Sequence, residues 1–385
     1  MTPSFSLRRI PSATTGTEQK QGRNIMKQTL TRRSFTTGLA AGAVLASACR
    51  VRAQSSDTVV IASYGGQFQD AQRKALFEPF EKSTGIKVVE ATGPSLAKVR
   101  TMNMSGNIEW DVAEFTPADF LVLAENNLLE KIDYGAIDQS IIAKVDKRVV
   151  HPYGVGALFY SNVIAFNTKR YPTGKHPKSW ADVWDFQKFS GPRILPSGIY
   201  VVRPNEFALL AEGLLPQQLY PLDLERSYRS LSNIKPHVVK WQTTGAMAPQ
   251  AIVDGEADFG MASQGRIAQL KAQGAPVDYD WNQGLITADY WGIPKGAKNV
   301  QNALKFIEFA SRPEPQAELS KLIPYSPANP DAFKLLSEEQ LKDLATAPDN
   351  LKKQVWLDAG WWAQKTNGKS NVERNIDMWN AWLQR

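Results

Sequence analysis

Short apolar runs alternate with amphipathic segments along most of this chain. TVVIAS, IKVVEA and WDVAEF, all in the first third, are predicted to form short buried strands. Apolar residues recur at helical spacing in the segments around them, residues 68–83, 94–105 and 117–127. Strands that alternate with helices in this way predict an α/β fold with a mostly parallel sheet.

The same alternation continues through the second half. VIAF, VVKW and ADFGMA are predicted strands, and helices are predicted to begin at SWADVWDF, NEFALLAEG and MAPQAIVDG. NVQNALKFIEFAS, residues 299–311, has one apolar face and is predicted to form an amphipathic helix. Residues 350–385 are helical in pattern and hold five tryptophans, which we interpret as core and inter-helix packing.

The positive net charge is concentrated at the N-terminus. The chain has 45 Lys/Arg and 38 Asp/Glu, but residues 1–53 hold nine of the basic residues and only one acid. The 36 basic and 37 acidic residues that remain give residues 54–385 a net charge of −1. Because this part has no excess positive charge to neutralise phosphates, we predict no nucleic-acid partner.

The N-terminal segment has the features of an export signal. TRRSF, residues 31–35, is a twin-arginine pattern, and the apolar stretch GLAAGAVLASAC follows it at residues 38–49. Twelve residues are too few to span a bilayer, which takes about 20. Val51-Arg52-Ala53 is similar to a small-x-Ala cleavage site. We therefore expect residues 1–53 to be a twin-arginine leader that directs the protein to the periplasm.

Two details of this leader bear on the mature chain. MKQTLTRRSF, which begins at Met26, is a more usual signal start, so residues 1–25 are interpreted as an over-extended gene start. The lone cysteine, Cys49, lies in LASAC, which resembles a lipoprotein cleavage box but has Ala46 where leucine is favoured, so lipid anchoring is the less favoured expectation. Cleavage after Ala53 leaves a chain without a disulfide, a thiolate metal site or a cysteine nucleophile.

Known signatures of enzymes are missing from the sequence. His151, His176 and His237 share no metal-binding spacing, and the chain contains no HExxH, CxxC, GxSxG or GxxxxGK[ST] motif. Gly65 and Gly66 stand between a predicted strand and a helix, as phosphate-binding glycines do, but no third glycine follows them. We predict no catalytic residue, metal or cofactor. A secreted α/β enzyme acting on a small polar molecule is the alternative function.

Seven stretches, in sequence order, resemble one family of proteins. They are YGGQFQDAQRKALFEPFEKSTGIKV, WDVAEF, SWADVWDFQKFSGPR, NEFALLAEGLLPQQLYPLDLERSYRSL, DGEADFGMASQGRI, YWGIPKGAKNVQNALKFIEFASRPEPQAEL and YSPANPDAF. Together they resemble bacterial extracellular solute-binding proteins of the spermidine/putrescine-binding group, over essentially all of residues 57–385. Members of that family are clamps that deliver a ligand to an ABC transporter.

The resemblance implies a periplasmic-binding-protein fold, in which a ligand cleft lies between two lobes joined by hinge crossings. Lobe 1 is expected at residues 57–160 and 290–328, and lobe 2 at residues 161–289 and 329–385. A ligand that bridges both lobes shifts the population toward the closed form. We expect a monomer whose partners are a small-molecule ligand and an ABC permease of the inner membrane.

The candidate ligand-binding residues lie at the expected cleft. Clefts in α/β sheets form at the carboxyl ends of strands, and the resemblance selects the same positions. Asp289 matches an acidic position that binds an amine in the polyamine proteins, and the ring of Tyr64 is placed to cover an alkyl chain or an ammonium group. The expected ligand-binding residues are Tyr64, Gly65, Gly66, Phe115, Thr116, Tyr200, Arg203, Glu206, Thr244, Gly245, Ser263, Gln264, Arg266, Asp289 and Trp291.

One departure from the polyamine pattern bears on the ligand. Polyamine binders carry acids in the loop before the helix that NEFALL matches, whereas this loop reads SGIYVVRPNEF and has no acid before Glu206. The guanidinium of Arg203 would repel a polycation and suits a carboxylate. Arg203 and Arg266 with Asp289 fit a zwitterion such as 4-aminobutyrate, or an anionic solute. We therefore expect an amine-bearing solute, either an ω-amino acid or a polyamine, captured for an importer.

Overall fold

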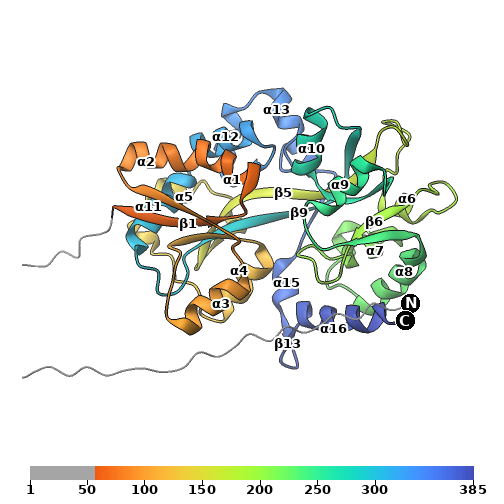
Figure 1. The fold of residues 1–385 in the computed structure, drawn as a ribbon, viewed down its shortest axis with the longest axis horizontal. Coiled ribbons are helices and arrows are strands. Elements are labelled where there is room, and N and C mark those ends of the chain that lie inside the picture. The colour runs from red at the N-terminus through yellow and green to blue at the C-terminus, as the bar shows by residue number, and fades with distance from the viewer. Residues whose placement is uncertain (1–56) are drawn as a thin grey trace, which may run out of the picture. The chain divides into compact units, whose positions relative to one another are not determined.

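Two long strands run through the middle of the fold and pair with each other. The computed structural model describes residues 57–385, so the leader predicted at residues 1–53, with its twin-arginine and cleavage motifs and Cys49, lies outside the described residues. β5 (Gly154–Asn167) and β9 (Val277–Gly292) are antiparallel and pair over most of their length. Figure 1 shows them crossing at the centre of the fold, between two groups of helices.

The first part of the chain follows the predicted order of strands and helices. Ser95 and Thr116 begin two of its helices by accepting the backbone N–H groups of Lys98 and Asp119. Gly85 ends another helix in the left-handed conformation. The elements of this part are β1 (Thr58–Ser63), α1 (Gly66–Gln72), a π-helical turn (Arg73–Phe77), α2 (Glu78–Thr84), β2 (Lys87–Thr92), α3 (Leu96–Ser105), β3 (Val112–Phe115), α4 (Pro117–Glu125), α5 (Gln139–Ile142) and β4 (Val150–His151).

The second part repeats the pattern and ends in helices. Asp223 and Ser370 each accept a backbone N–H group at the start of a helix. The elements between the two long strands are α6 (Trp180–Trp184), β6 (Arg193–Pro196), α7 (Asn205–Ala211), α8 (Leu224–Ile234), β7 (Val238–Gln242), α9 (Met247–Asp254), β8 (Phe259–Ser263) and α10 (Gln264–Ala272). Those after β9 are α11 (Val300–Ala310), α12 (Pro313–Leu322), β10 (Ser326–Pro327), α13 (Glu338–Lys342), α14 (Pro348–Leu351), β11 (Val355–Trp356), α15 (Ala359–Ala363), β12 (Lys365–Thr366), β13 (Lys369–Ser370) and α16 (Asn371–Leu383).

One mixed sheet organises these elements. Its strands follow the order β2-β1-β3-β9-β5-β8-β6-β7, and β4, β10 and β11 attach to the two long strands. The pairs toward both ends of the sheet are parallel, but β3·β9, β9·β5 and β5·β8 are antiparallel. The prediction of a mostly parallel sheet is therefore wrong at the centre. There the chain passes between the two halves along extended strands instead of through crossover helices.

Buried apolar side chains form separate cores on the two sides of the centre. The cores of one side draw on residues 59–159 and 286–328, and those of the other on residues 164–285 and 355–382. This separation is the two-lobed α/β arrangement, with β5 and β9 running through both lobes. The exact lobe boundaries proposed from the sequence remain predictions.

Three C-terminal tryptophans, Trp362, Trp379 and Trp382, pack inside the core of residues 164–285 and 355–382, whereas Trp356 packs against the other core. Trp379 and Trp382 lie against Trp241, with ring centroids 5.0 and 5.5 Å away. Trp362 is also buried in this core. Their rings are therefore part of the packing, as the sequence predicts. Among residues 57–385, no helix is both long enough and apolar enough to cross a bilayer.

Candidate ligand-binding site

Two adjoining cavities lie where residues of the two lobes meet, at the carboxyl ends of β1, β3 and β8. The first, here called the hinge cavity, has a volume of about 310 Å³ and includes side chains of β5 and β9 in its lining. The second, the turn cavity, measures about 280 Å³ and is bounded by the glycine turn and by α10. Both are lined by Tyr64, Phe68, Arg266 and Tyr325, so they form one continuous recess.

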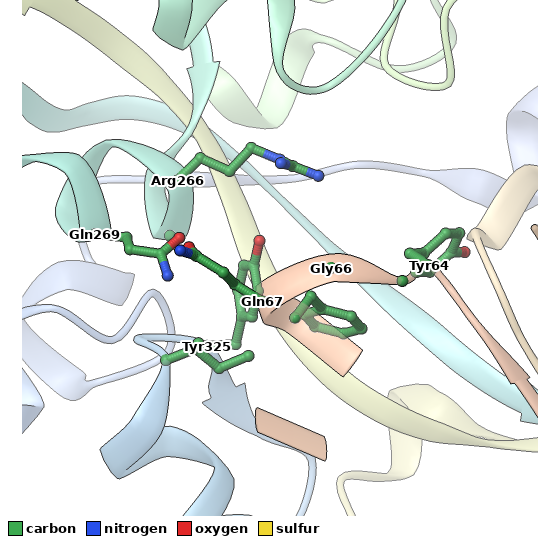
Figure 2. A pocket seen from close by; sticks show the side chains of 10 residues that line it. Tyr64, Gly66, Gln67, Arg266, Gln269 and Tyr325 are labelled. Carbon is green, nitrogen blue, oxygen red and sulfur yellow. The ribbon is translucent and has the colours of Figure 1, made fainter. Parts of the chain in front are cut away.

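The turn cavity is built from both lobes. Figure 2 shows Gln67 and Tyr64 on the side of α1, and Arg266 and Gln269 on the side of α10. α10 follows directly after β8, so the first turn of this helix carries Arg266 to the mouth of the hinge cavity. A molecule in this recess can therefore contact both lobes at once.

The turn Gly65-Gly66 needs glycine for its backbone conformation. Gly65 has φ 72° and ψ −177°, a region that only glycine adopts readily, and Gly66 has φ 59°. The N–H group of Gly65 already donates to Oε1 of Gln69 at 3.0 Å. A Cβ atom on Gly65 would meet the side chain of Thr92 at 3.5 Å. The turn thus lines the recess, and its positive φ angles, more than close approach of a ligand, account for the two glycines.

Asp289 supplies a carboxyl group to the hinge cavity. Its side chain is 6% exposed, and its Oδ1 has no hydrogen-bond partner among the described residues. Burial and the charge of Glu114 hold the pKa of Asp289 well above its ordinary value, although a hydrogen bond from Tyr160 lowers it in part. A buried carboxylate oxygen without a donor favours a cation as its partner.

Arg266 supplies a positive group to the same cavity from α10, which packs into the core of residues 165–277, whereas the neighbours of Asp289 on β9 belong to the core of residues 59–159 and 286–328. Its side chain forms no ion pair with any residue that the structure describes. Its guanidinium lies beside Gly245, where an added Cβ atom would come within 3.1 Å of Nε and 3.3 Å of the Tyr200 hydroxyl. The absence of a side chain at Gly245 therefore leaves room for this guanidinium, which can accept a carboxylate in bidentate fashion.

Aromatic rings cover the space around Asp289. Tyr64 and Phe68 lie 6.1 Å apart, Phe68 and Tyr325 5.6 Å apart, and Tyr325 and Tyr160 6.0 Å apart, measured between ring centroids. All four rings line the hinge cavity. Burial, followed by the charges of Asp289 and Glu114, keeps the pKa of Tyr64 well above its ordinary value, so its hydroxyl is neutral at physiological pH. Neutral aromatic faces beside a carboxylate suit an ammonium group.

Seven of the fifteen predicted residues line the hinge cavity. They are Tyr64, Thr116, Tyr200, Gly245, Ser263, Arg266 and Asp289. Gly65 and Gly66 line the turn cavity. Thr116 has a structural role as well, because its hydroxyl accepts the N–H of Asp119 at the start of α4. The proposed contact set is taken from these nine residues.

Arg203 and Glu206 line neither cavity, and both are buried in contact with Trp362. Arg203 is 5% exposed, and its guanidinium carbon stands 4.7 Å from the ring centroid of Trp362. Glu206 accepts hydrogen bonds from Nε1 of Trp362 at 2.6 Å and from the Tyr220 hydroxyl at 2.8 Å. Burial lowers the pKa of Arg203, and the charge of Glu206 opposes that effect. The sequence argument assigned Arg203 to a ligand carboxylate. In the structure its guanidinium stacks on Trp362 and lines neither cavity, and its Nε has no hydrogen-bond partner within residues 57–385.

Four further predicted residues do not line either cavity. Phe115 and Trp291 are 1% exposed and belong to the core, where Trp291 packs against Phe306. Gln264 donates to the carbonyl oxygens of Pro324 and Asp343 at 2.9 and 2.6 Å, which ties α10 to the C-terminal segments. Thr244 is exposed, next to Gly245.

In the hinge cavity, the structure adds seven lining residues that the sequence reasoning missed. They are Phe68, Leu158, Tyr160, Asn162, Val201, Val202 and Tyr325. Phe68 belongs to the YGGQF stretch and Tyr325 to YSPANPDAF, both of which had already stood out as family-like. Recognising residues 154–167 as one hinge strand would have pointed to Tyr160 and Asn162, because alternate residues of such a strand face the cleft.

A larger cavity, of about 510 Å³, does not offer comparable chemistry. It is lined mainly by apolar groups around Ile286, Tyr290 and Trp356. Its charged members already have partners: Arg148 donates to Asp146 at 3.0 Å, and Asp358 accepts the N–H of Trp361 at 2.8 Å. We therefore assign the site to the recess that holds Asp289. Within residues 57–385, no group of three or more His, Cys, Asp and Glu side chains is arranged to hold a metal ion.

Comparison with known proteins places the chain in a family. Residues 75–349 match the model of the bacterial extracellular solute-binding proteins. A gamma-aminobutyric acid-binding protein of Pseudomonas aeruginosa is 34% identical, over 89% of this chain and 95% of the relative. A spermidine/putrescine-binding periplasmic protein of Escherichia coli is 27% identical, over 83% and 91%. The crystal structure of an ABC transporter substrate-binding protein from Bradyrhizobium japonicum superposes with a TM-score of 0.79 at 34% identity, covering 85% of this chain and 99% of that one.

These matches and the cavity between two lobes define the class of protein: a solute-binding protein with the periplasmic-binding-protein fold. The chain belongs to the bacterial extracellular solute-binding family, whose members serve ABC transporters and are not enzymes. The resemblance drawn from the seven sequence stretches is confirmed, and so is the two-lobed α/β fold.

Proposed function

We propose that this protein captures a small zwitterion of the ω-amino acid type, such as 4-aminobutyrate, and delivers it to an ABC permease of the inner membrane. The observation that carries the proposal is that Asp289 and Arg266 line the same cavity without forming an ion pair with each other. One is an acid with an unpartnered oxygen, and the other a guanidinium without an ion pair among the described residues. The 34% identity to a protein named for gamma-aminobutyric acid supports the same ligand class.

The two charged groups stand beside different cores, and this supplies the mechanism. The ammonium group binds at Asp289 on β9, within the aromatic rings, and the carboxylate binds at Arg266 on α10. Only a closed arrangement satisfies both ends of the ligand. Binding therefore shifts the population toward the closed form, which the permease distinguishes from the open form. No covalent bond changes in this cycle.

A polyamine is the second candidate ligand. The 27% identity to a spermidine/putrescine-binding protein and the four aromatic rings around Asp289 favour it. Arg266 stands against it, because a guanidinium that lines the cavity repels the second ammonium group of a diamine. Periplasmic location follows from the family; export through the twin-arginine route, and a monomeric state, are part of the proposal.

A thermal-shift panel on the purified protein tests the proposal. The panel contains 4-aminobutyrate, butyrate, putrescine, spermidine and glucose. A ligand at 100 times its Kd adds about 2.7 kcal/mol to the free energy of unfolding. We expect the largest stabilisation with 4-aminobutyrate and little with butyrate, which lacks the amine. A shift with putrescine or spermidine alone would select the polyamine, and no shift with any amine would overturn the amine-binding function.

A further inference from the structure

Glu114 lies beneath Asp289 on the same face of the sheet. In the register of β3 and β9, Glu114 pairs with Trp291, two residues from Asp289 on the same strand. Residues two apart on a strand point to the same face, so Glu114 and Asp289 are diagonal neighbours across the two strands. Ser63, the last residue of β1, stands beside Glu114 on the other side.

Within residues 57–385, the side chains that hydrogen-bond to Glu114 are polar and uncharged. The Glu114 side chain is fully buried. Its Oε2 accepts hydrogen bonds from Ser63 at 2.9 Å and Gln72 at 2.7 Å, while its Oε1 has no partner within residues 57–385. The titratable groups that interact with Glu114 or Asp289 are Asp119 of α4, Tyr160 of β5, Tyr64, Tyr200, Tyr290 and Tyr325, none of which is a cation. Arg266 is the positive group that lines the same cavity as Asp289, and it acts on Tyr325.

An ionised Glu114 would be costly in this position. A buried carboxylate needs either a cation or a full set of donors, and Glu114 has neither. Ionised carboxylates on diagonal neighbours also repel each other. The pair therefore titrates as a unit, and one of its two protons is retained to a higher pH than the other. Burial raises the pKa of Glu114 to about 7, although the hydrogen bonds from Gln72 and Ser63 lower it in part.

We propose that Glu114 is a positioning residue that holds a proton in the empty site and releases it to solvent when an ammonium group binds Asp289. The arriving positive charge stabilises both carboxylates in their ionised forms, so the proton is displaced as the cation enters. Capture of the amine is then linked to pH, and affinity for it rises as the pH rises through neutrality. The proposal rests on the proposed function in one respect, that an ammonium group binds at Asp289.

Proton release is measured by calorimetry in two buffers with different ionisation enthalpies, with 4-aminobutyrate and putrescine as probes. Asp289 titrates as well, so the comparison is between variants. At about pH 6 to 7, wild type is expected to release more protons per bound amine than Glu114→Gln. The matched control is Glu109→Gln, which removes a half-exposed acid paired with Lys98 and should leave the release unchanged. Equal release from wild type and Glu114→Gln would overturn the proposal.

A ligand-free measurement separates this inference from the identity of the ligand. In a potentiometric titration from about pH 8.5 to 5.5, ordinary glutamates take up little proton. Wild type is expected to take up most of one proton more than Glu114→Gln. If wild type takes up this extra proton but binds no amine, the proposed function is wrong and the protonation of Glu114 is still supported. Identical titrations would sink the protonated Glu114 whatever the ligand.

If Glu114→Gln does not fold, Asp289→Asn provides the test. Infrared difference spectra of this variant at pH 8.5 and 5.5 then report on Glu114 without the second carboxyl. We expect a carbonyl band of a buried protonated carboxylic acid to grow in at the lower pH. Absence of that band across the range would overturn the proposal.

Discussion

Asp289 and Arg266 face one cavity from segments that pack into different cores, and neither is ion-paired within residues 57–385. Asp289 belongs to β9, which runs through both lobes, and Arg266 belongs to the first turn of α10. A carboxylate and a guanidinium held apart in this way attract the two ends of a zwitterion.

Replacement of Asp289 by asparagine should weaken amine binding. The variant keeps the shape of the side chain but removes the charge that the ammonium group meets. A hydrogen bond to a charged group contributes about 1.5–3 kcal/mol, so the affinity for 4-aminobutyrate should fall about 10- to 100-fold. Calorimetric titration measures the change. Asp254→Asn, on the exposed end of α9, is the control and should bind as wild type does. Unchanged affinity in Asp289→Asn would remove this residue from the site.

Replacement of Arg266 by glutamine should separate the two ligand classes. Loss of the guanidinium removes the partner of a carboxylate, so affinity for 4-aminobutyrate is expected to fall about tenfold or more. Putrescine, which has no carboxylate, should bind as well or better, because a repelling charge has gone. Parallel titrations of both compounds measure the two effects. The control is Arg229→Gln, an exposed arginine of α8. A parallel loss for both ligands would contradict the assignment.

Replacement of Arg203 by methionine should affect stability more than binding. Arg203 stacks on Trp362 next to the buried Glu206 and does not line the hinge cavity. Its removal leaves Glu206 without a nearby positive charge, which should lower the free energy of unfolding by about 3 kcal/mol. Urea denaturation gives the stability, and titration of the remaining folded protein gives the affinity. A large loss of affinity at wild-type stability would return Arg203 to the ligand site.

The glycine turn should tolerate alanine differently at its two positions. Gly65 has backbone angles that only glycine adopts readily, and Gly66 lies in the left-handed region. Gly65→Ala should therefore cost about 1–3 kcal/mol, and Gly66→Ala about 1 kcal/mol. Thermal unfolding of the two variants compares the costs. If Gly65→Ala were as stable as wild type, the turn would not need glycine for its conformation.

Much of the local structure followed from the sequence. The apolar run TVVIAS forms β1, and Ser95 and Thr116 cap helices close to their predicted starts. The pattern failed for the long strand of residues 154–167, of which only VIAF was recognised. GVGALFYSN holds glycines and polar residues that lower its strand signal, and its conformation depends on pairing with β9 over a long distance in sequence.

The candidate site was predictable in part, and the division has a physical basis. Tyr64, Ser263 and Asp289 lie at strand ends, and strand ends mark the cleft in α/β sheets. Arg203 has the right chemistry, but whether its guanidinium reaches the cavity or stacks on Trp362 depends on a tryptophan far away in sequence. The sequence alone could not decide between the two.

By itself, the sequence determined the class of protein: local hydrophobic patterns, helix caps and ordered family-like stretches are properties of neighbouring residues. Tertiary structure alone decided which side chains share a cavity, which carboxylates lie on one face of the sheet, and which charged groups are buried away from the cavity. Those properties depend on burial and on contacts between residues more than a hundred positions apart, such as Glu114 with Asp289. Periodicity along the chain carries no information about them, because it reports which face of an element is buried and not what that face meets.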